Sequence, residues 1–583
     1  MTRSRPRPAR ARPNRKPPAP AAALAALERV VREYRAGAAR LKLALLDALE
    51  DTHLERAGEV LRLHEALCFL SAYPDSRAVE RRARALLSAF CRREDLRRHR
   101  EALADSGIAG TPIRYRFFSP TARWLAERWP DQLAIDWKDF DQRERVETFL
   151  PLFALAAETP GLDEYDLGAR GWLKAMRAPR SNEAAFFIRR FAAIAASDVV
   201  REALWDELDT PFSLAPRTIG KSLTPARTLE LHARAPRAFQ RRALDRGRPK
   251  LRAEIRRGPR RVRDCSPGEA RALIDLARGA MITRSRDLDA FSYADPRDVR
   301  LVDCGEGLAF ACIGVQPARR LMLEAVYAFL TLRNGVPIGY VLNSALFGSA
   351  EMAYNVFDTF RGAEAGKVYG RALAMVRHLF GASAFTIVPY QLGHLNDEAI
   401  ESGAWWFYRK LGYAPRDRAT AKLMHAEEAK LERDSGHRSS AAVLRRLARE
   451  NLYFHAGRER DDVMGLLPLP SVGLAVTRFL AANWGDDRER AERECVAEAA
   501  RLLEVGREGP RGFSDDQRDW WRRWAPLVCV LPGLEGWSAG ERRGLVEVIG
   551  SKGGPRESEF VLRFDRHRKL REAIRAIAVK TRT

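Results

Sequence analysis

An arginine and a glycine at the junction between a strand pattern and a helix pattern could perform chemistry in this sequence. Arg361 and Gly362 follow the segment AEMAYNVFDTF, and small residues lead on to Gly366 and Lys367. The first N–H groups of a helix lack intrahelical partners, and the helix dipole favours negative charge there. Glycine lets a phosphate approach the backbone, and arginine adds charge-assisted hydrogen bonds. The stretch predicts a phosphate-binding loop, with an ordinary glycine turn as the alternative.

Hydrophobic periodicity predicts the elements that would position this loop. AEMAYNVFDTF has the pattern of a strand, and KVYGRALAMVRHLF places its apolar residues on one helical face. Upstream, SPGEARALIDLARGAM opens with a Ser-Pro helix start. It is followed by DVRLVDC, LAFACIGV, YAFLTL and VPIGYVL, which predict an antiparallel meander with a tight hairpin at Asn334-Gly335. Downstream, AFTIVPYQL predicts a strand and NDEAIESGAWWFYRKLGYAP a helix.

The order of these parts resembles the GNAT superfamily of acyl-CoA-dependent N-acyltransferases. In that family a meander leads to a strand, an Arg-Gly-rich pyrophosphate loop, a helix, a second strand and a closing helix that ends in Tyr-x-x-x-Gly-Phe. The matching ending here is Tyr408-Arg-Lys-Leu-Gly412-Tyr413, followed by Pro415. The resemblance covers roughly residues 265–425 and implies a mixed α/β fold with a GNAT-like central sheet.

Two features of the chain depart from the family pattern. Read from Arg361, the loop has Glu364 where the family has glycine. Read from Lys367, KVYGRA fits apart from its first residue, but that frame lies inside the predicted helix. Asn396 could match the family's asparagine after the second strand, with an inserted turn at Ser402-Gly403 absorbing the extra length.

The resemblance also implies roles for particular residues, with acetyl-CoA or another acyl-CoA as co-substrate. Tyr408 would be the general acid that protonates the departing thiolate. The backbone at Val356 and Phe357, spread by a bulge, would polarise the thioester carbonyl. Glu351 or Asp358 could be the base that deprotonates the acceptor amine. The implied cofactor contacts are Val356, Phe357, Arg361, Gly362, Gly366, Lys367 and Asn396.

A structural interpretation competes with the catalytic one at several of these positions. Tyr408 could be a tyrosine packed at a helix end beside Trp405 and Trp406. Glu351 could be an exposed surface carboxylate. The tryptophans of DWWRRW, near the C-terminus, have the spacing of a helix with one packed face rather than of an exposed binding patch.

The flanks of the central stretch divide the chain further. Residues 1–22 form a basic tail predicted to be disordered, and 23–216 a mainly helical region. In 217–263 basic residues outnumber acidic ones by 16 to 3, which favours a basic linker over a core element. The GNAT-like domain is assigned to 264–425. Residues 426–583 are predicted to be helical, SAAVLRRLARENLYF included.

Charge and composition limit the classes of partner. The chain has 583 residues and a formal net charge of +24, with arginine far commoner than lysine, as in proteins of GC-rich bacterial genomes. Residues 1–16 and 217–263 are the stretches that could contact a polyanion or nucleic acid. No apolar run is long enough to span a membrane, and the scattered cysteines form no CxxC pair, so a cytoplasmic location is expected.

Metal chemistry is not expected. There is no HExxH, and His53 and His64 lie on mixed helical faces, where surface or capping positions are expected.

These observations lead to one functional expectation and one alternative. The chain is expected to be an N-acyltransferase that moves an acetyl or other acyl group from acyl-CoA to an amine-bearing acceptor. The alternative is a GNAT-like module without catalysis that binds protein or RNA.

Overall fold

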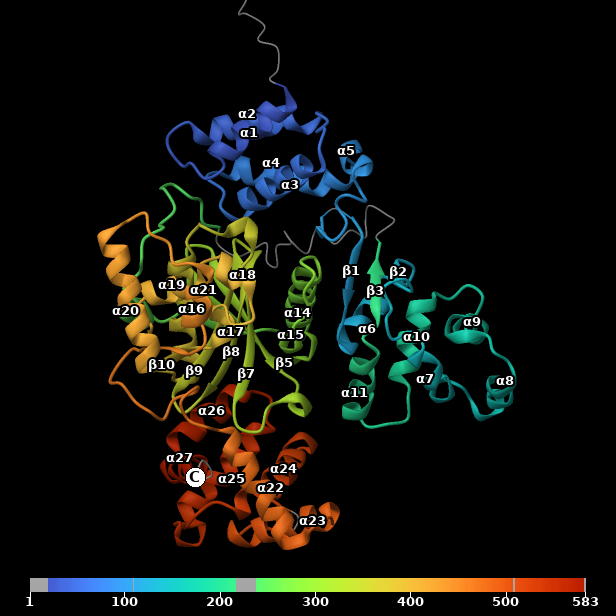
Figure 1. The fold of residues 1–583 in the computed structure, drawn as a ribbon, viewed down its shortest axis with the longest axis vertical. Coiled ribbons are helices and arrows are strands. Elements are labelled where there is room, and N and C mark those ends of the chain that lie inside the picture. Colours follow the sequence, from blue (N-terminus) through green and yellow to red (C-terminus); the bar gives the residue numbers. More distant parts are fainter. Residues whose placement is uncertain (1–18, 109, 216–236, 507–508, 581–583) are drawn as a thin grey trace, which may run out of the picture.

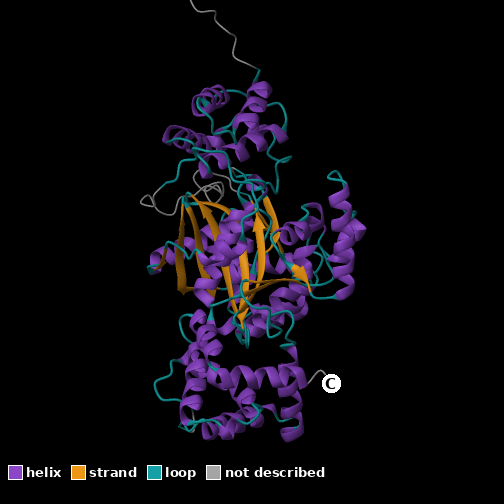
Figure 2. Cartoon of the chain, turned by 90° about the vertical axis from the view of Figure 1, so that its left-hand side faces the viewer, coloured by secondary structure: helices purple, strands orange, loops and turns teal. Residues whose placement is uncertain are grey.

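The computed structural model describes residues 19–108, 110–215, 237–506 and 509–580 (Figure 1). Over these ranges the protein has a mixed α/β fold. A large sheet occupies the middle, and helices lie at both of its ends and on both of its faces (Figure 2). In the same ranges, no helix combines the length and apolar character needed to cross a bilayer.

The central sheet has nine strands within the described residues, in the order β11-β12-β10-β9-β8-β7-β6-β5-β4. Strands β5 to β8 form the antiparallel meander that the sequence predicted, and β4 and β9 extend it at its two edges. Its hairpin between β7 and β8 has Asn334 at φ 49° and Gly335 at φ 80°, which confirms the tight turn. The strands are β4 (Arg261–Asp264), β5 (Ala294–Gly305), β6 (Leu308–Val315), β7 (Ala325–Arg333), β8 (Val336–Leu346), β9 (Ser349–Val356), β10 (Ala384–Ile387), β11 (Ala414–Pro415) and β12 (Leu452–His455).

The strand pair β9–β10 is the parallel one in this sheet. It is paired only from Ser349–Ala384 to Glu351–Thr386, after which β9 continues to Val356 without β10 beside it. The strand β12 lies between β10 and β11 and is antiparallel to both. The helices of this part are α16 (Ala365–Phe380), α17 (Pro389–Leu392), α18 (Asp397–Glu401), α19 (Ala404–Lys410), α20 (Arg418–Arg433) and α21 (Ala441–Leu447).

Alternate residues of the meander pack into two different cores, because successive strand side chains point to opposite faces. Phe310, Cys312, Tyr327 and Phe329 pack with α16 on one face. On the other face, Ala311, Ile313, Ala328 and Leu330 pack with α14 (Pro267–Ile282) and α15 (Asp289–Ser292). The helix α14 starts with a capping box between Ser266 and Glu269, in agreement with the predicted helix start.

Helices of the N-terminal region cover one end of the sheet (Figure 1). Their apolar residues join the core on the α14 face. The helices are α1 (Pro20–Val30), α2 (Ala38–Glu50), α3 (Ala57–Ala72), α4 (Arg77–Ala89) and α5 (Glu94–Arg98).

Residues 111–214 form a separate core around a small sheet of order β1-β3-β2, so this part of the expected helical region also contains strands. Asp287, just before α15, accepts hydrogen bonds from Phe118 N (2.9 Å) and Thr121 Oγ1 (3.0 Å) and so connects this core to the central one. The elements are β1 (Ile113–Arg116), α6 (Ser119–Arg128), β2 (Leu133–Ile135), α7 (Arg145–Phe153), α8 (Thr159–Glu164), α9 (Gly168–Met176), α10 (Glu183–Ala192), α11 (Asp198–Leu208) and β3 (Pro211–Leu214).

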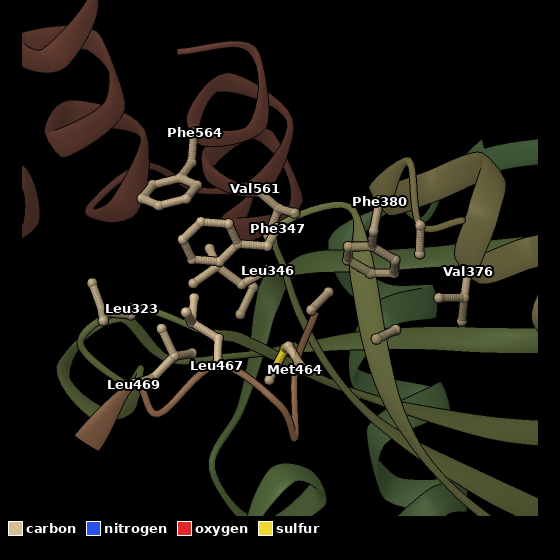
Figure 3. Close-up of a cluster of buried hydrophobic side chains, with 14 of the residues drawn as sticks. Leu323, Leu346, Phe347, Val376, Phe380, Met464, Leu467, Leu469, Val561 and Phe564 are labelled. Carbon is tan, nitrogen blue, oxygen red and sulfur yellow. The ribbon is translucent and has the colours of Figure 1, made fainter. Parts of the chain in front are cut away.

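The C-terminal helices pack against the opposite end of the sheet. Val561 and Phe564 of α26 lie against Leu346 and Phe347 at the β8–β9 turn (Figure 3), with the Phe347 and Phe564 ring centroids 5.3 Å apart. The tryptophans of DWWRRW are buried, which confirms their predicted packing. The helices are α22 (Pro470–Trp484), α23 (Arg488–Leu502), α24 (Asp515–Cys529), α25 (Ala539–Lys552), α26 (Glu557–Arg566) and α27 (Arg568–Lys580).

Buried hydrogen bonds and an ion pair accompany these apolar contacts. Lys552 Nζ donates to Glu557 Oε1 (2.5 Å) and to the carbonyl of Glu324 (2.8 Å), and both charged side chains are fully buried. Arg320 Nη1 donates to the carbonyls of Lys552 and Gly554, both at 2.6 Å. The connection between α25 and α26 is thereby held against the β6–β7 end of the sheet.

Two sequence predictions about element type differ from the structure. Residues 217–236 of the predicted linker lie outside the described residues, but α13 (Leu251–Arg256) packs against α16, and β4 pairs with β5. LYFH, assigned to a helix, is β12, because α21 ends at Leu447 and pairing with β10 outweighs the local helical pattern.

Candidate functional site

The site lies where β9 separates from β10. The N–H of Phe357 donates to the carbonyl of Ile338, on the β8 side. Because backbone N–H groups alternate between the two neighbours of a strand, those of Met352, Tyr354 and Val356 point to the β10 side. Those of Tyr354 and Val356 face the part of the strand where β10 no longer follows. A row of backbone donors is thus directed into the divergence.

Tyr408, on α19, reaches this row of donors. The backbone N–H of Tyr354 faces its phenol oxygen. Burial raises the pKa of Tyr408 well above that of a free phenol, and the backbone group of Tyr354 acts in the opposite direction. The side chain is therefore a neutral proton donor at physiological pH.

An aromatic cluster fills the divergence around Tyr408. Tyr369 of α16 has its ring centroid 5.5 Å from that of Tyr408, and Tyr413 has its own at 5.7 Å. The phenol oxygens of Tyr369 and Tyr413 are 2.6 Å apart. Tyr408 is only 2% exposed, and it lines none of the three cavities described in this protein. In this conformation the phenol has no open path to solvent through those cavities.

The predicted phosphate loop connects β9 to α16 through a short 3-10 turn, η5 (Asp358–Phe360), and Gly362 has φ 71°. Arg32, just beyond α1, donates from Nη1 to the carbonyl of Arg361 (2.9 Å) and from Nη2 to that of Thr359 (3.2 Å). A cation from the N-terminal helices therefore lies directly on the loop.

The Arg361 side chain is held by carboxylates. Its Nη2 lies 2.9 Å from Asp358 and 2.5 Å from Glu398. Arg286 also pairs with Glu398, at 3.0 Å, and donates to the Tyr340 phenol at 2.9 Å. Burial opposes ionisation of Glu398, but Arg361 and Arg286 outweigh it and hold the pKa of this carboxyl below its usual range. No local sequence pattern indicates this network, because its members come from distant segments.

Gly366 and Lys367 lie in the first turn of α16. A side-chain carbon on Gly366 would come within 3.0 Å of Pro249 Cδ, so glycine is needed for the close approach of residues 247–249. Lys367 Nζ is 2.7 Å from Glu306 and 3.6 Å from Glu364. Glu364, which replaces the family's glycine, also pairs with Arg333 at 3.3 Å. The loop is thus a cationic segment with part of its charge neutralised.

Phe357 and Asn396, two of the expected cofactor contacts, make other hydrogen bonds in this structure. The register between β8 and β9 is unbroken from Ser349 to Val356, so no bulge spreads the strand there. The Phe357 N–H is engaged by β8, whereas that of Val356 faces the divergence. The Asn396 side chain caps α18 through the N–H of Ala399 (3.2 Å) and donates to the carbonyl of Tyr390 (3.0 Å).

Of the two candidate bases, Asp358 lies beside a cavity. Glu351 is on β9 at the last pair with β10, and burial, together with Glu324, raises its pKa. Asp358 lies seven residues further along, a distance on the order of 20 Å for extended chain. The side chain of Asp358 is 85% exposed and lines a cavity of about 290 Å³ at the end of β9. The two carboxylates are therefore too far apart for both of them to act on one acceptor.

Sequence reasoning did not find this 290 Å³ cavity. Its walls come from α3, the turn before β1, the segment after α14 and the end of β9, and they include Glu65, Asp105, Arg284 and Arg286. The guanidinium carbon of Arg284 lies 3.5 Å from the centroid of the Phe357 ring. The charged segment TRSRD after α14 is the one sequence feature that could have indicated this cavity. Only the tertiary packing, however, places this segment beside β9.

One group of described residues has the types of a metal site. His64, Glu65 and Cys68 of α3 offer ligand atoms within 4.8 Å of one another. His64 is fully buried against Phe90, at a ring distance of 5.0 Å, and is not the surface or capping residue expected. His64 Nδ1 lies 3.2 Å from Glu65 and 3.6 Å from Cys68 Sγ, so hydrogen bonding accounts for the grouping.

Comparisons with family models, with curated proteins and with solved structures found no match to this chain.

Proposed function

We propose that this protein transfers an acyl group from acyl-CoA to an amine, in the manner of the GNAT superfamily it resembles. The observation that carries the proposal is the parallel pair β9–β10, which separates after Glu351 with a buried phenol, Tyr408, at the point of divergence. A helix, α16, begins behind the diverging strand. This arrangement gathers backbone donors, a proton donor and a helix N-terminus at one place.

The thioester would lie along the diverging half of β9. The N–H of Val356 would donate to its carbonyl oxygen as negative charge develops in the tetrahedral intermediate. Tyr408 would protonate the thiolate as the C–S bond breaks, and the backbone N–H of Tyr354, which lowers the pKa of this phenol, would stabilise the phenolate left behind. For thioester to enter, the aromatic cluster around Tyr408 must open.

The pyrophosphate would lie at the start of α16. The unpaired N–H groups of the first turn point there, and Arg32 contacts the carbonyls of the preceding loop. Arg361 is bound to Asp358 and Glu398, so it would have to leave these carboxylates to reach a phosphate.

The acceptor amine would enter from the 290 Å³ cavity, with Asp358 as its base. This carboxylate lines the cavity, whereas Glu351 is on the order of 20 Å away along the strand. The basic surface of the chain favours an acidic or nucleic-acid-associated acceptor.

The test compares two buried phenols of the same cluster. Acetyl-CoA binding is measured by calorimetry, and CoA thiol release is followed with a panel of amines, for the wild type, Tyr408→Phe and Tyr413→Phe. We expect Tyr408→Phe to bind acetyl-CoA and to lose about 10²–10⁴-fold in transfer rate, the usual contribution of a general acid. Tyr413→Phe removes the partner of the Tyr369 phenol instead and should keep most of its activity.

A separate variant, Arg361→Ala, tests where acetyl-CoA binds. Micromolar binding weakened by this substitution would place phosphate at the loop. No binding of acetyl-CoA or CoA to the wild type, or equal rates in the two tyrosine variants, would reject the proposal.

A second candidate is a GNAT-like binding module without catalysis, for protein or RNA. The observation that favours it is the filled divergence, in which Tyr408 is 2% exposed. A module of this kind that binds RNA should show steep salt dependence in filter binding and no thiol release.

A further inference from the structure

A second cavity, of about 240 Å³, lies between α13, the β5–β6 turn and the first two turns of α16. Lys367 and Arg371 line it from α16, while Tyr369 belongs to the aromatic cluster. Two residues along a helix correspond to a rotation of roughly 200°, so the cavity and the Tyr408 cluster lie on different flanks of α16.

Cations outnumber carboxylates around this cavity. Each of the three carboxylates in its wall is already paired with a cation of the same wall: Glu254 with Arg257 (3.2 Å), Glu306 with Lys367 (2.7 Å) and Glu364 with Arg333 (3.3 Å). Two further guanidinium groups of the wall, those of Arg260 and Arg371, are left without a carboxylate of the wall to pair with.

Neither of these two groups has a carboxylate partner among the described residues. Arg371 is only 7% exposed and donates to the carbonyls of Arg257 and Gly258, the latter at 2.9 Å. It also forms a hydrogen bond with the thiol of Cys304, whose pKa burial raises to about 11, so this thiol is neutral. Arg260 is exposed at the cavity rim, and its side chain has no hydrogen-bond or ion-pair partner in the described parts of the chain.

Arg333 is a third guanidinium of the wall; it is only 3% exposed, and its charge is paired with Glu364. A buried guanidinium compensated only by neutral groups, as that of Arg371 is, is unfavourable unless an anion completes the site. The cavity that all of these groups line is where such an anion would lie.

We propose that this cavity, between α13 and α16, binds the dianion of a phosphate monoester. Such a group carries a charge of about −1.5 to −2 at neutral pH and three acceptor oxygens, which matches the two guanidinium groups without a carboxylate partner. The monoester belongs either to a small phosphorylated metabolite or to the 3′-phosphate of CoA.

The test uses the full chain and charge reversal at the exposed rim. Arg260→Glu changes an exposed residue, so the fold should be kept, and circular dichroism checks this. Arg256→Glu, on α13 but outside the cavity wall, is the matched control. Calorimetric titration at constant ionic strength uses ribose 5-phosphate, with ribose as the neutral control, and compares CoA with 3′-dephospho-CoA.

Two results would support the site and distinguish the sources. If the ligand is a free metabolite, ribose 5-phosphate binds, ribose does not, and Arg260→Glu weakens binding at least tenfold while Arg256→Glu does not. If the phosphate belongs to CoA, Arg260→Glu weakens the binding of CoA at least tenfold but leaves the binding of dephospho-CoA unchanged. The proposal is overturned if Arg260→Glu weakens neither phosphate ligand more than Arg256→Glu does. Because the first comparison involves neither acyl transfer nor CoA, its result does not depend on the proposed enzymatic function.

Discussion

Two tyrosines only five residues apart in the aromatic cluster differ in what their phenol groups contact. Tyr408 and Tyr413 are both buried aromatic residues of the same cluster. The phenol of Tyr413 contacts another phenol, that of Tyr369, whereas that of Tyr408 contacts the backbone of β9. Only Tyr408 is therefore connected to the donors that would hold a thioester.

A second residue with a shifted pKa lies where the C-terminal helices pack against the sheet. Asp565 accepts a hydrogen bond from Gly348 N at 2.8 Å, and burial raises its pKa to about 6 despite that bond and the charges of Arg571 and Arg460. A carboxyl whose folded pKa is raised stabilises the fold at low pH. This contribution is lost as the pH rises from the unfolded value, near 3.8, through about 6.

We therefore expect Asp565→Asn to be at least as stable as the wild type above pH 6. The neutral amide keeps an oxygen for Gly348 and removes the cost of ionisation, worth about 1–3 kcal/mol. Melting temperatures measured from pH 5 to 7.5 should separate in favour of the variant as the pH rises. Asp461→Asn, at a side chain 82% exposed, should show no such separation. A variant that melts lower than the wild type at pH 7.5 would contradict the assignment.

At the scale of elements, the connection between α25 and α26 fixes the C-terminal helices to the sheet. Its Lys552–Glu557 pair is fully buried, and Lys552 also lies 4.2 Å from the centroid of the Phe560 ring. Such a pair contributes little net stability compared with apolar residues, but the loss of one partner leaves a buried charge uncompensated.

Lys552→Met should accordingly lower the local stability of α25 and α26 by about 3–5 kcal/mol. The double variant Lys552→Met/Glu557→Gln should recover part of that loss, because no unpaired charge then remains. Hydrogen exchange of the amides in these two helices measures the opening free energy locally, without assuming two-state unfolding of the whole chain. A single variant that exchanges like the wild type would show that the pair does not fix this connection.

Elements with local signals were predictable, and those that depend on distant pairing were not. Asn334-Gly335 specifies its hairpin and Ser266 with Glu269 its helix start from a few adjacent residues. By contrast, LYFH forms β12 only because β10 and β11 leave a space of one strand between them.

The same distinction applies to the candidate site. The positions of Tyr408 on a helix and of Arg361 before one were predictable from the sequence. The burial of Tyr408, and the contacts of Arg361 with Glu398 and of its carbonyl with Arg32, depend on tertiary packing that no local pattern encodes.

At the scale of the whole molecule, the N-terminal helices hold the loop before α16. Arg32 is the contact, through the carbonyls of Thr359 and Arg361, and its guanidinium also lies 4.7 Å from the centroid of the Phe69 ring. The first helices of the chain thereby restrict a loop more than 300 residues away in sequence.

Arg32→Ala should increase hydrogen exchange of residues 359–366 about tenfold or more, because two hydrogen bonds to this loop are lost. Arg29→Ala, whose side chain donates only within its own helix to the carbonyl of Ala25 (3.2 Å), is the matched control. Exchange of this loop that is equal in both variants would mean that the N-terminal helices do not restrict it.

The position of β12 has a consequence for how the protein is made. While the ribosome has produced only the chain up to β11, the outer edge of β10 has no neighbour, because the strand that separates the two has not yet emerged. At roughly 5–20 residues per second, this edge stays open for some seconds in every nascent chain. An unpaired strand edge is a template for aggregation, so the β10 edge can mispair with another chain during this interval.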